Sequence, residues 1–464
     1  MRTSLAIKLF GSSVAVGAIS LPSATMAACN TVNGVVTCTE ASTVDDANAA
    51  ISRTPPPAVT VVVAPNAVVQ GSFNSQIRVD NSRFRGAIGY TNDGTVGATD
   101  RPNDFVAFGD SSNTANTFNL INRGVQNGGI SALAMGGAIT GTNSGTVTRG
   151  ITLTGSGPIS FTNTGTVFLS NNPGGAGAIR LESSRSVATT LADGTQRSTV
   201  SGGLVTAAIG GRVVSPAIGT TPARPSGVVA RGTGGADVTI TGQAGVLSVE
   251  AGGETNNQFF SFTNAAGGTS INNSSRRTSS AEARVVVGET GSVTSIFLTS
   301  FGSATAAING VVQGGFNSVR VSATGEETSR STRTFGNFLT TSGQSFANSA
   351  TSVGGAASID IGATGRVLGD MFAASNAGPV TVRVAGIVGG ATSPGSISAT
   401  AVGSNGSSQG SSANRPDGSF ESSNASRQGP AGGAALVVIG MTGNVASNVS
   451  ASGTFPRWWR MPPG

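Results

Sequence analysis

The side chains best suited to chemistry are a few carboxylates in the first quarter of the chain. Asp100 and Asp104 stand four positions apart, and Asp93 and Asp110 lie close by in the sequence. A pair of carboxylates on one surface could carry out the acid and base steps of polysaccharide hydrolysis or elimination. The segment Asp100-Arg101-Pro102-Asn103-Asp104 is also typical of a turn with a salt bridge, and we favour this interpretation. If the chain were an enzyme, Asp100 and Asp104 would be its catalytic candidates, but we expect no enzyme.

Other catalytic and metal-binding arrangements have little support. The chain has no histidine, which excludes Ser-His-Asp and Cys-His sets and histidine-based metal sites. The segment 406–410 (GSSQG) has the spacing of a nucleophile elbow, but it lies in a Ser/Gly-rich stretch with no strand before it. The segment 234–237 (GGAD) is one partial copy of a calcium-binding repeat that works only in tandem. We therefore expect no cofactor and no metal.

The N-terminal residues have the pattern of a signal peptide. Arg2 and Lys8 give a positive start, residues 9–21 are apolar, and small residues precede Ala27 and Ala28. We place cleavage after Ala27 or Ala28, so residues 1–27 form the signal peptide and export machinery is an expected partner. No later run reaches 18 apolar residues, so we expect no transmembrane span in the mature chain.

The two cysteines, Cys29 and Cys38, follow the cleavage site. An even count in an exported chain predicts a disulfide, here closing a hairpin over Asn33-Gly34. The alternative is a lipoprotein that is lipidated at Cys29, which would leave Cys38 unpaired. Residues 44–51 could form one or two helical turns, and residues 28–54 are predicted to be a cap that shields the first strands.

Composition favours many short strands. The chain has 464 residues with 69 glycines, 10% charged residues and 5% aromatic residues, and no long stretch has helical periodicity. The formal net charge is +6, but the arginines are scattered apart from Arg276-Arg277. No basic run contains interleaved aromatics, so we expect no nucleic-acid partner.

Short strands joined by glycine turns must position any site. The pattern apolar-Gly-x-Thr-Gly-x-Val occurs at 287–293, 361–367 and 439–445, and a looser Asn-x-Gly turn followed by Val occurs upstream. We interpret both patterns as strand, turn, strand, with glycine supplying a positive φ. The asparagines could also stack between circuits as an amide ladder. The repeat-turn glycines are Gly94, Gly124, Gly145, Gly165, Gly291, Gly365 and Gly443.

Spacing and internal similarity predict a β-solenoid. Asn122, Asn143 and Asn163 recur about every 20 residues, which is one circuit of three short strands. The segment 66–75 (NAVVQGSFNS) matches 309–318 (NGVVQGGFNS) at eight of ten positions, so distant parts of the chain share one unit. Polar stretches at about 183–202, 220–227, 253–283, 325–352 and 401–430 are interpreted as loops extruded from circuits.

The predicted organisation follows from these patterns. It comprises a signal peptide (1–27), a cap with a disulfide (28–54), a β-helix (55–400), a Ser/Gly/Asn-rich loop or linker (401–430), a last β-helix circuit (431–454) and a disordered tail (455–464).

The export signal, the early cysteine pair, the Asn-x-Gly-x-Val ladder and the Gly-x-Thr-Gly-x-Val turns together resemble bacterial autotransporter passenger regions. The resemblance implies an all-β fold, a right-handed parallel β-helix of roughly 20-residue circuits. It also implies a location at the outer membrane or cell surface of a Gram-negative bacterium, or outside the cell, and often adhesion to a surface receptor or glycan. The chain departs from that family because it has one tyrosine, Tyr90, and no C-terminal block of barrel strands. A periplasmic location, a purely structural exoprotein and a β-helix polysaccharide lyase or hydrolase therefore stay open as alternatives.

Overall fold

The computed structural model describes most of the chain after residue 28. The described residues are 29–80, 82–169, 177–216, 224–263, 269–277, 281–314, 317–335, 342–376, 378–390, 395–403, 407–414, 420–427, 433–440, 442–446 and 448–453. The predicted signal peptide and the predicted tail at 455–464 lie outside these residues. Within them, no helix is long and apolar enough to cross a membrane.

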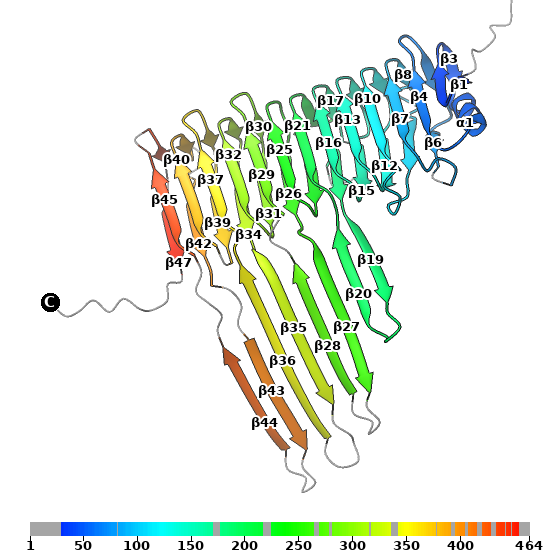
Figure 1. Cartoon of the computed structure of the whole chain (residues 1–464). Coiled ribbons are helices and arrows are strands. Elements are labelled where there is room, and N and C mark those ends of the chain that lie inside the picture. Colours follow the sequence, from blue (N-terminus) through cyan, green and yellow to red (C-terminus); the bar gives the residue numbers. More distant parts are fainter. Residues whose placement is uncertain are drawn as a thin grey trace, which may run out of the picture.

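The chain winds into a parallel β-helix, which confirms the predicted fold class (Figure 1). Each circuit adds one strand to sheet A, a short strand to sheet B in most circuits, and one strand to sheet C. Sheet A has 14 strands and sheet C has 12, while sheet B is divided into blocks of eight and five strands. Isolated bridges from Arg212 to Gln243 and from Gln243 to Ser292 connect the two blocks of sheet B.

The strands of sheet A are β1 (Asn30–Val32), β2 (Val35–Cys38), β4 (Val59–Val63), β7 (Ile88–Asn92), β10 (Phe118–Asn122), β13 (Ile139–Asn143), β16 (Ile159–Asn163), β21 (Val205–Ile209), β25 (Ala236–Ile240), β29 (Ala283–Val287), β32 (Ala304–Ile308), β37 (Ala357–Ile361), β40 (Val380–Val384) and β45 (Ala435–Ile439). The strands of sheet B are β3 (Ala41–Thr43), β5 (Val68–Gln70), β8 (Thr95–Val96), β11 (Val125–Gln126), β14 (Thr146–Val147), β17 (Thr166–Phe168), β22 (Arg212–Ser215), β23 (Arg224–Pro225), β30 (Ser292–Val293), β33 (Val311–Val312), β38 (Arg366–Val367), β41 (Ile387–Val388) and β46 (Asn444–Val445). The strands of sheet C are β6 (Gln76–Val79), β9 (Asp104–Phe108), β12 (Ile130–Met135), β15 (Ile151–Gly155), β18 (Ile179–Ser183), β24 (Val228–Gly232), β26 (Val246–Ala251), β31 (Ser295–Ser300), β34 (Val319–Ala323), β39 (Met371–Ser375), β42 (Ile397–Ala401) and β47 (Val449–Gly453).

The core follows from the alternation of buried and outward-facing residues along most strands of sheets A and C. In β16, residues 159, 161 and 163 are buried while Ser160 and Thr162 face solvent. The parallel register stacks Ile139, Ile159 and Val205 in one inward column. Burying each such side chain contributes roughly 1.5–3 kcal/mol. A one-residue slip would expose the whole row, so the alternation fixes the register.

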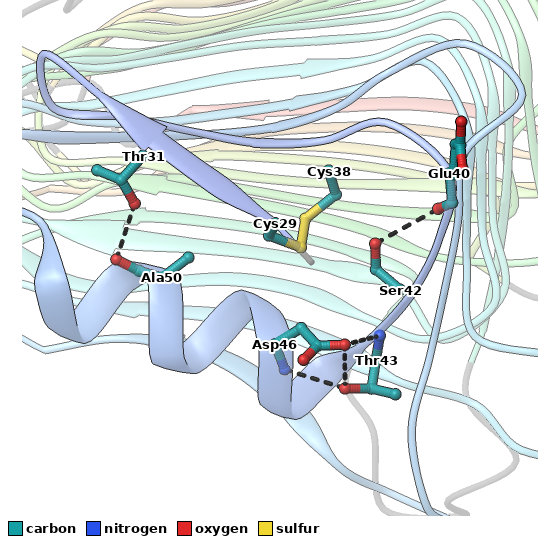
Figure 2. Close-up of a disulfide and its surroundings, with 8 residues drawn as sticks. All are labelled: Cys29, Thr31, Cys38, Glu40, Ser42, Thr43, Asp46 and Ala50. Atoms are coloured by element: carbon teal, nitrogen blue, oxygen red, sulfur yellow. Dashed lines mark hydrogen bonds between the residues drawn. A yellow bond between two sulfur atoms is a disulfide. The ribbon is translucent and has the colours of Figure 1, made fainter. Parts of the chain in front are cut away.

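A cap covers the first end of the β-helix. Helix α1 (Val44–Arg53) begins with a capping box in which Thr43 and Asp46 bond reciprocally (Figure 2). Cys29 and Cys38 form a disulfide beside the helix. The Asn48 amide bonds the backbone of β6, donating to Gln76 O and accepting from Arg78 N at 2.9 Å each. The helix therefore satisfies strand-edge groups that would otherwise be unpaired.

An amide ladder runs through four circuits. Asn92, Asn122, Asn143 and Asn163 are buried at the end of sheet A strands, in register with one another. Each of the first three donates from Nδ2 to Oδ1 of the next, at 2.9, 2.6 and 2.6 Å. This confirms the predicted ladder. The same column carries Val63 before it and Ile209 after it, so amide and aliphatic side chains are alternatives at one position.

The repeat-turn glycines act differently from our prediction. None of Gly94, Gly124, Gly145, Gly165, Gly291, Gly365 and Gly443 has a positive φ. A β-carbon on Gly145 would instead collide with the carbonyl oxygen of Gly124, and one on Gly165 with that of Gly145. Glycine is required because the turn backbones of successive circuits lie against each other, with no room for a side chain.

The polar stretches interpreted as loops are mostly strands, which corrects the prediction of a loop or linker at 401–430. Four hairpins leave the β-helix between sheets C and A and pair into an eight-stranded antiparallel sheet, here called the side sheet (Figure 1). Its strands are β19 (Arg185–Thr190), β20 (Gln196–Ser201), β27 (Thr255–Thr263), β28 (Thr269–Arg277), β35 (Glu326–Phe335), β36 (Ser342–Val353), β43 (Ser407–Asn414) and β44 (Phe420–Arg427). The stretch at 220–227 differs, since it contributes β23, which pairs with β22.

The hairpins follow every second circuit, after β18, β26, β34 and β42. Neighbouring strands of a sheet are about 4.8 Å apart, so two circuits advance the β-helix by about 9.6 Å. A two-stranded hairpin has the same width. Successive hairpins therefore meet edge to edge, and β20 pairs with β27, β28 with β35, and β36 with β43.

Candidate binding groove

A groove of about 470 Å³ lies where sheet B turns into sheet C in successive circuits. Phe73 belongs to the turn between β5 and β6, Asp100 to the turn between β8 and β9, and Arg149 to the turn between β14 and β15. Phe168 at the end of β17 extends the groove further along the β-helix axis. The groove is lined by Phe73, Thr99, Asp100, Pro102, Thr148, Arg149, Phe168 and Pro216.

Phe73 presents its ring to solvent, with 63% of the residue exposed. The guanidinium of Arg149 lies 5.8 Å from the ring centroid, and Arg149 Nη1 donates to Asn74 Oδ1 at 2.7 Å. Asn74 has a φ of 60°, a left-handed conformation that asparagine tolerates well. Asn317 occupies the matching position of the second sequence copy and has a φ of 58°, so the two similar segments share a backbone bend.

Asp100 stands at the rim of this groove in a tight turn. Ala98 and Arg101 exchange two backbone hydrogen bonds across the turn, at 3.0 and 3.1 Å. The Asp100 carboxylate is exposed and lies 3.8 Å from Arg101 Nε. The turn with a salt bridge that we favoured from the sequence is present.

Asp104 has a separate, structural environment. Its Oδ1 accepts from the backbone N–H of Gly129 at 2.7 Å, which satisfies a donor in the equivalent turn of the next circuit. Asp370 has the same role later in the chain, where it accepts from the hydroxyl and the backbone N–H of Ser396. The Ser396 hydroxyl bond, with the Ser396 amide, holds the pKa of Asp370 below its usual value.

The remaining acids do not join Asp100. Asp93 accepts from Arg123, with 2.9 Å between Arg123 Nη2 and Asp93 Oδ2, and this bond raises the pKa of Arg123. Asp110 closes its own turn by accepting from the hydroxyl and amide of Ser112, which lower its pKa. Asp100 is thus the one carboxylate among the described groove residues, and the part of the chain that the structure describes holds no cluster of three acids or cysteines suited to a metal ion.

A second, shallower groove of about 400 Å³ follows the turns between sheets A and B. Gly94, Gly124, Gly145 and Gly165 lie along it, and because glycine has no side chain, the backbone forms this part of the surface. The Asp93–Arg123 pair lies beside them. This groove offers mainly backbone and hydroxyl groups, and no aromatic side chain lines it among the described residues.

Sequence reasoning identified Asp100 but missed Phe73 and Arg149. Phe73 was visible as a large aromatic residue in a turn segment, and a matching Phe316 occurs in the similar segment downstream. Arg149 is an isolated arginine, and only the stacking of circuits brings it to a residue 75 positions away. Of the other sequence motifs, Asp237 lies 3.4 Å from Arg284 on the next strand, and Ser407 begins β43 of the side sheet.

A scan against protein-family models found no match, and searches of curated proteins and of solved structures found none either.

Proposed function

We propose that this protein is an exported β-helical scaffold that adheres to a glycan through the Phe73 groove. The observation that carries the proposal is that an exposed aromatic ring, Phe73, lines one open groove together with the guanidinium of Arg149 and the carboxylate of Asp100. A pyranose ring has an apolar face of C–H groups that stacks on an aromatic ring. Its hydroxyls accept hydrogen bonds from Arg149 and donate to Asp100, and charge-assisted bonds of this kind are the stronger ones.

Binding suits this groove better than bond cleavage. Glycosidases of the common retaining and inverting types use two carboxyl groups, about 5–5.5 Å or 6.5–9.5 Å apart. The described groove residues offer one carboxylate, that of Asp100. Asp104 does not line the groove, and its Oδ1 accepts from the backbone N–H of Gly129. The signal-peptide pattern and the Cys29–Cys38 disulfide support an exported location. The adhesive role also agrees with the resemblance to autotransporter passengers.

Glycan-array binding followed by titration calorimetry tests the proposal. Phe73→Ala removes the stacking surface and should weaken binding of the array hits at least tenfold. Arg149→Lys keeps the charge but loses the planar fork, and should weaken binding as well. Phe297→Ala is the matched control, because Phe297 is also an exposed aromatic residue but lies on β31. An array without hits, or equal binding by Phe73→Ala, would show that the groove is not the adhesive site.

The enzymatic alternative rests on Asp100. Incubation of the array hits with the protein, followed by product analysis, separates the two functions. We expect intact glycans with the natural chain and with Asp100→Asn. Turnover that disappears in Asp100→Asn would replace the adhesive proposal with a carbohydrate-active enzyme.

A further inference from the structure

The side sheet carries a pocket of its own, of about 470 Å³. The turn between β19 and β20 lines it together with residues of β20, β27, β28 and β35, which lie side by side in the sheet (Figure 1). These elements come from three separate hairpins, so the pocket exists only because the hairpins pair. We call it the side-sheet pocket, and its lining includes Asp193, Arg197, Gln258, Phe260, Asn272 and Arg330.

Two exposed arginines lie in one row across this pocket. Arg197 of β20 lies opposite Gln258 of β27, and Gln258 lies opposite Ser274 of β28. Ser274 in turn lies opposite Arg330 of β35. Because directly opposed residues project from the same face of a sheet, both arginines belong to the pocket face. Three strand spacings of about 4.8 Å separate their Cα atoms, which is about 14 Å.

The two guanidiniums have no counter-charge in contact. Among the side-sheet residues whose side chains the structure describes, only Arg276 forms an ion pair, with Glu326 at 2.8 Å. Asp193 is the one acid among the described lining residues, and it accepts from the Thr195 N–H at 2.9 Å within its own turn. The pocket therefore presents two positive charges against one negative charge, and neither arginine has to break an ion pair to bind a ligand.

The rest of the lining can hold uncharged parts of a ligand. Gln258 is exposed between the two arginines, and Asn272 lies opposite Phe260 in the adjacent row. Phe260 is half-buried and contributes an aromatic surface. The bordering turn is well fixed, because Leu191 N donates to Thr195 O at 2.8 Å and Thr195 is only 8% exposed. The pocket therefore combines cations, amides and one apolar surface.

We propose that the side-sheet pocket binds an acidic oligosaccharide, with its carboxylate or sulfate groups on Arg197 and Arg330. A guanidinium donates two parallel N–H···O bonds to such an anion, and bonds of this kind are among the stronger ones. One small ion could contact both guanidiniums only if both side chains leaned over Gln258 and Ser274. Anionic groups on two different sugars leave each arginine above its own strand. Sugar hydroxyls would bond Gln258 and Asn272, and a pocket of this volume is in the usual range for organic ligands.

An oligosaccharide fits this pocket better than a nucleic acid does. Single-stranded nucleic acids are bound by basic grooves in which successive bases stack on aromatic side chains. Phe260 is the one aromatic residue among the described lining residues, and it is half-buried. The proposal does not rest on the Phe73 groove, since the two surfaces share no lining residue.

Titration calorimetry of the mature chain tests the proposal with three oligosaccharides of equal length. A heparin fragment carries sulfates, an oligogalacturonate carries carboxylates, and a malto-oligosaccharide is the neutral reference. We expect at least one acidic ligand to bind at least about tenfold more tightly than the neutral one, and the stronger of the two identifies the anionic group. Arg197→Gln, Arg330→Gln should weaken this binding at least about tenfold, because charge-assisted bonds at two positions are lost.

The matched control is Arg212→Gln, Arg366→Gln. It removes the same two charges from exposed positions on sheet B, so it tests whether net charge alone attracts the ligand. The control should bind like the natural chain. All four arginines are exposed, so both variants should keep the fold, as far-UV circular dichroism would confirm.

A second series tests the position of the charge. Gln258→Arg adds a guanidinium to the row between the two arginines and should strengthen binding of the acidic ligand, whereas Gln258→Glu should weaken it. Thr162→Arg adds the same charge on the outer face of β16 and should leave the affinity unchanged.

Four results would overturn the proposal. They are equal binding of acidic and neutral ligands, equal binding by the double variant and its control, tighter binding of single-stranded DNA than of either acidic saccharide, and loss of acidic binding in Phe73→Ala. The last result would place the ligand in the Phe73 groove. Conversely, Arg197→Gln, Arg330→Gln should leave the binding of neutral array hits unchanged, so the failure of one proposal does not decide the other.

Discussion

In the buried amide ladder, replacing one asparagine by valine should lower the local free energy of opening more than replacing all four. Asn143 accepts from Asn122 and donates to Asn163, both at 2.6 Å, and all three residues are buried. In Asn143→Val, Asn163 Oδ1 loses this partner, and Asn122 Nδ2 keeps only Thr146 O at 3.5 Å. Each unsatisfied buried group costs about 1–3 kcal/mol, so the single change should destabilise this region by about 2–6 kcal/mol.

Replacing Asn92, Asn122, Asn143 and Asn163 together by Val removes the amides as a set. The column already accepts Val63 on one side and Ile209 on the other, and the turn after Ile209 has the same length as the turn after Asn163. No amide is then left without a partner, apart from backbone groups in the turns such as Gly94 N. The quadruple variant should therefore be no less stable than Asn143→Val.

Hydrogen exchange read by mass spectrometry over β10, β13 and β16 gives the local free energy of opening, with urea unfolding by circular dichroism as a global check. A local measurement is needed because repeat structures need not unfold in two states. The reasoning would be refuted if Asn143→Val cost less than about 0.5 kcal/mol, the usual range of surface substitutions. It would fail equally if the four single costs simply added in the quadruple variant, because coupled partners should not add.

Three further predictions concern the turns and the cap. Gly145→Ala should lower the local free energy of opening of β13 and β14, measured by hydrogen exchange, by about 3 kcal/mol, because its β-carbon would meet the Gly124 carbonyl. Gly252→Ala, whose nearest neighbour would be at 3.9 Å, should change the local free energy of opening of β26 by no more than about 1 kcal/mol. Replacing both cysteines by Ser should destabilise the cap by about 2–3 kcal/mol, the value for a short loop, with faster hydrogen exchange in α1 but not in β32; equal exchange in α1 would contradict this. The Thr43 amide and hydroxyl lower the pKa of Asp46 in the folded cap. The ionised carboxylate therefore stabilises the cap above about pH 4, and this contribution is lost as the pH falls through the lowered pKa. The stability of α1 measured by hydrogen exchange should therefore depend less on acid pH in Asp46→Asn, and an unchanged dependence would show that the capping box does not cause it.

The repeating part of the fold could be predicted because its residues alternate. Val, Ile and Phe at every second position gave the strands, and the spacing of Asn122, Asn143 and Asn163 gave the circuit length. The helix in the cap was visible for a related reason, since residues 44–51 have an apolar face. These signals come from burial on one side only, which leaves a period in the sequence.

The side sheet lacked that signal. Its strands, such as β28 and β35, consist mainly of Ser, Thr, Asn and Arg, and the residues of both strands that the structure describes are exposed or half-buried. A sheet that is solvated on both faces has no apolar alternation, so its sequence resembles a loop. The Phe73 groove was missed for a different reason. Its parts are single residues from separate circuits, and only the stacking of the turns brings Arg149 beside Phe73.

The spacing of the hairpins constrains how such a chain can lengthen or shorten. Deleting the single circuit that contains β29 to β31 would bring the β27–β28 and β35–β36 hairpins one strand width too close, so that one of them would be forced out of the side sheet. Removing two circuits together with one hairpin would preserve every strand pairing. Changes in length should therefore be tolerated in steps of two circuits, because only such steps keep neighbouring hairpins at the distance at which they pair in the side sheet.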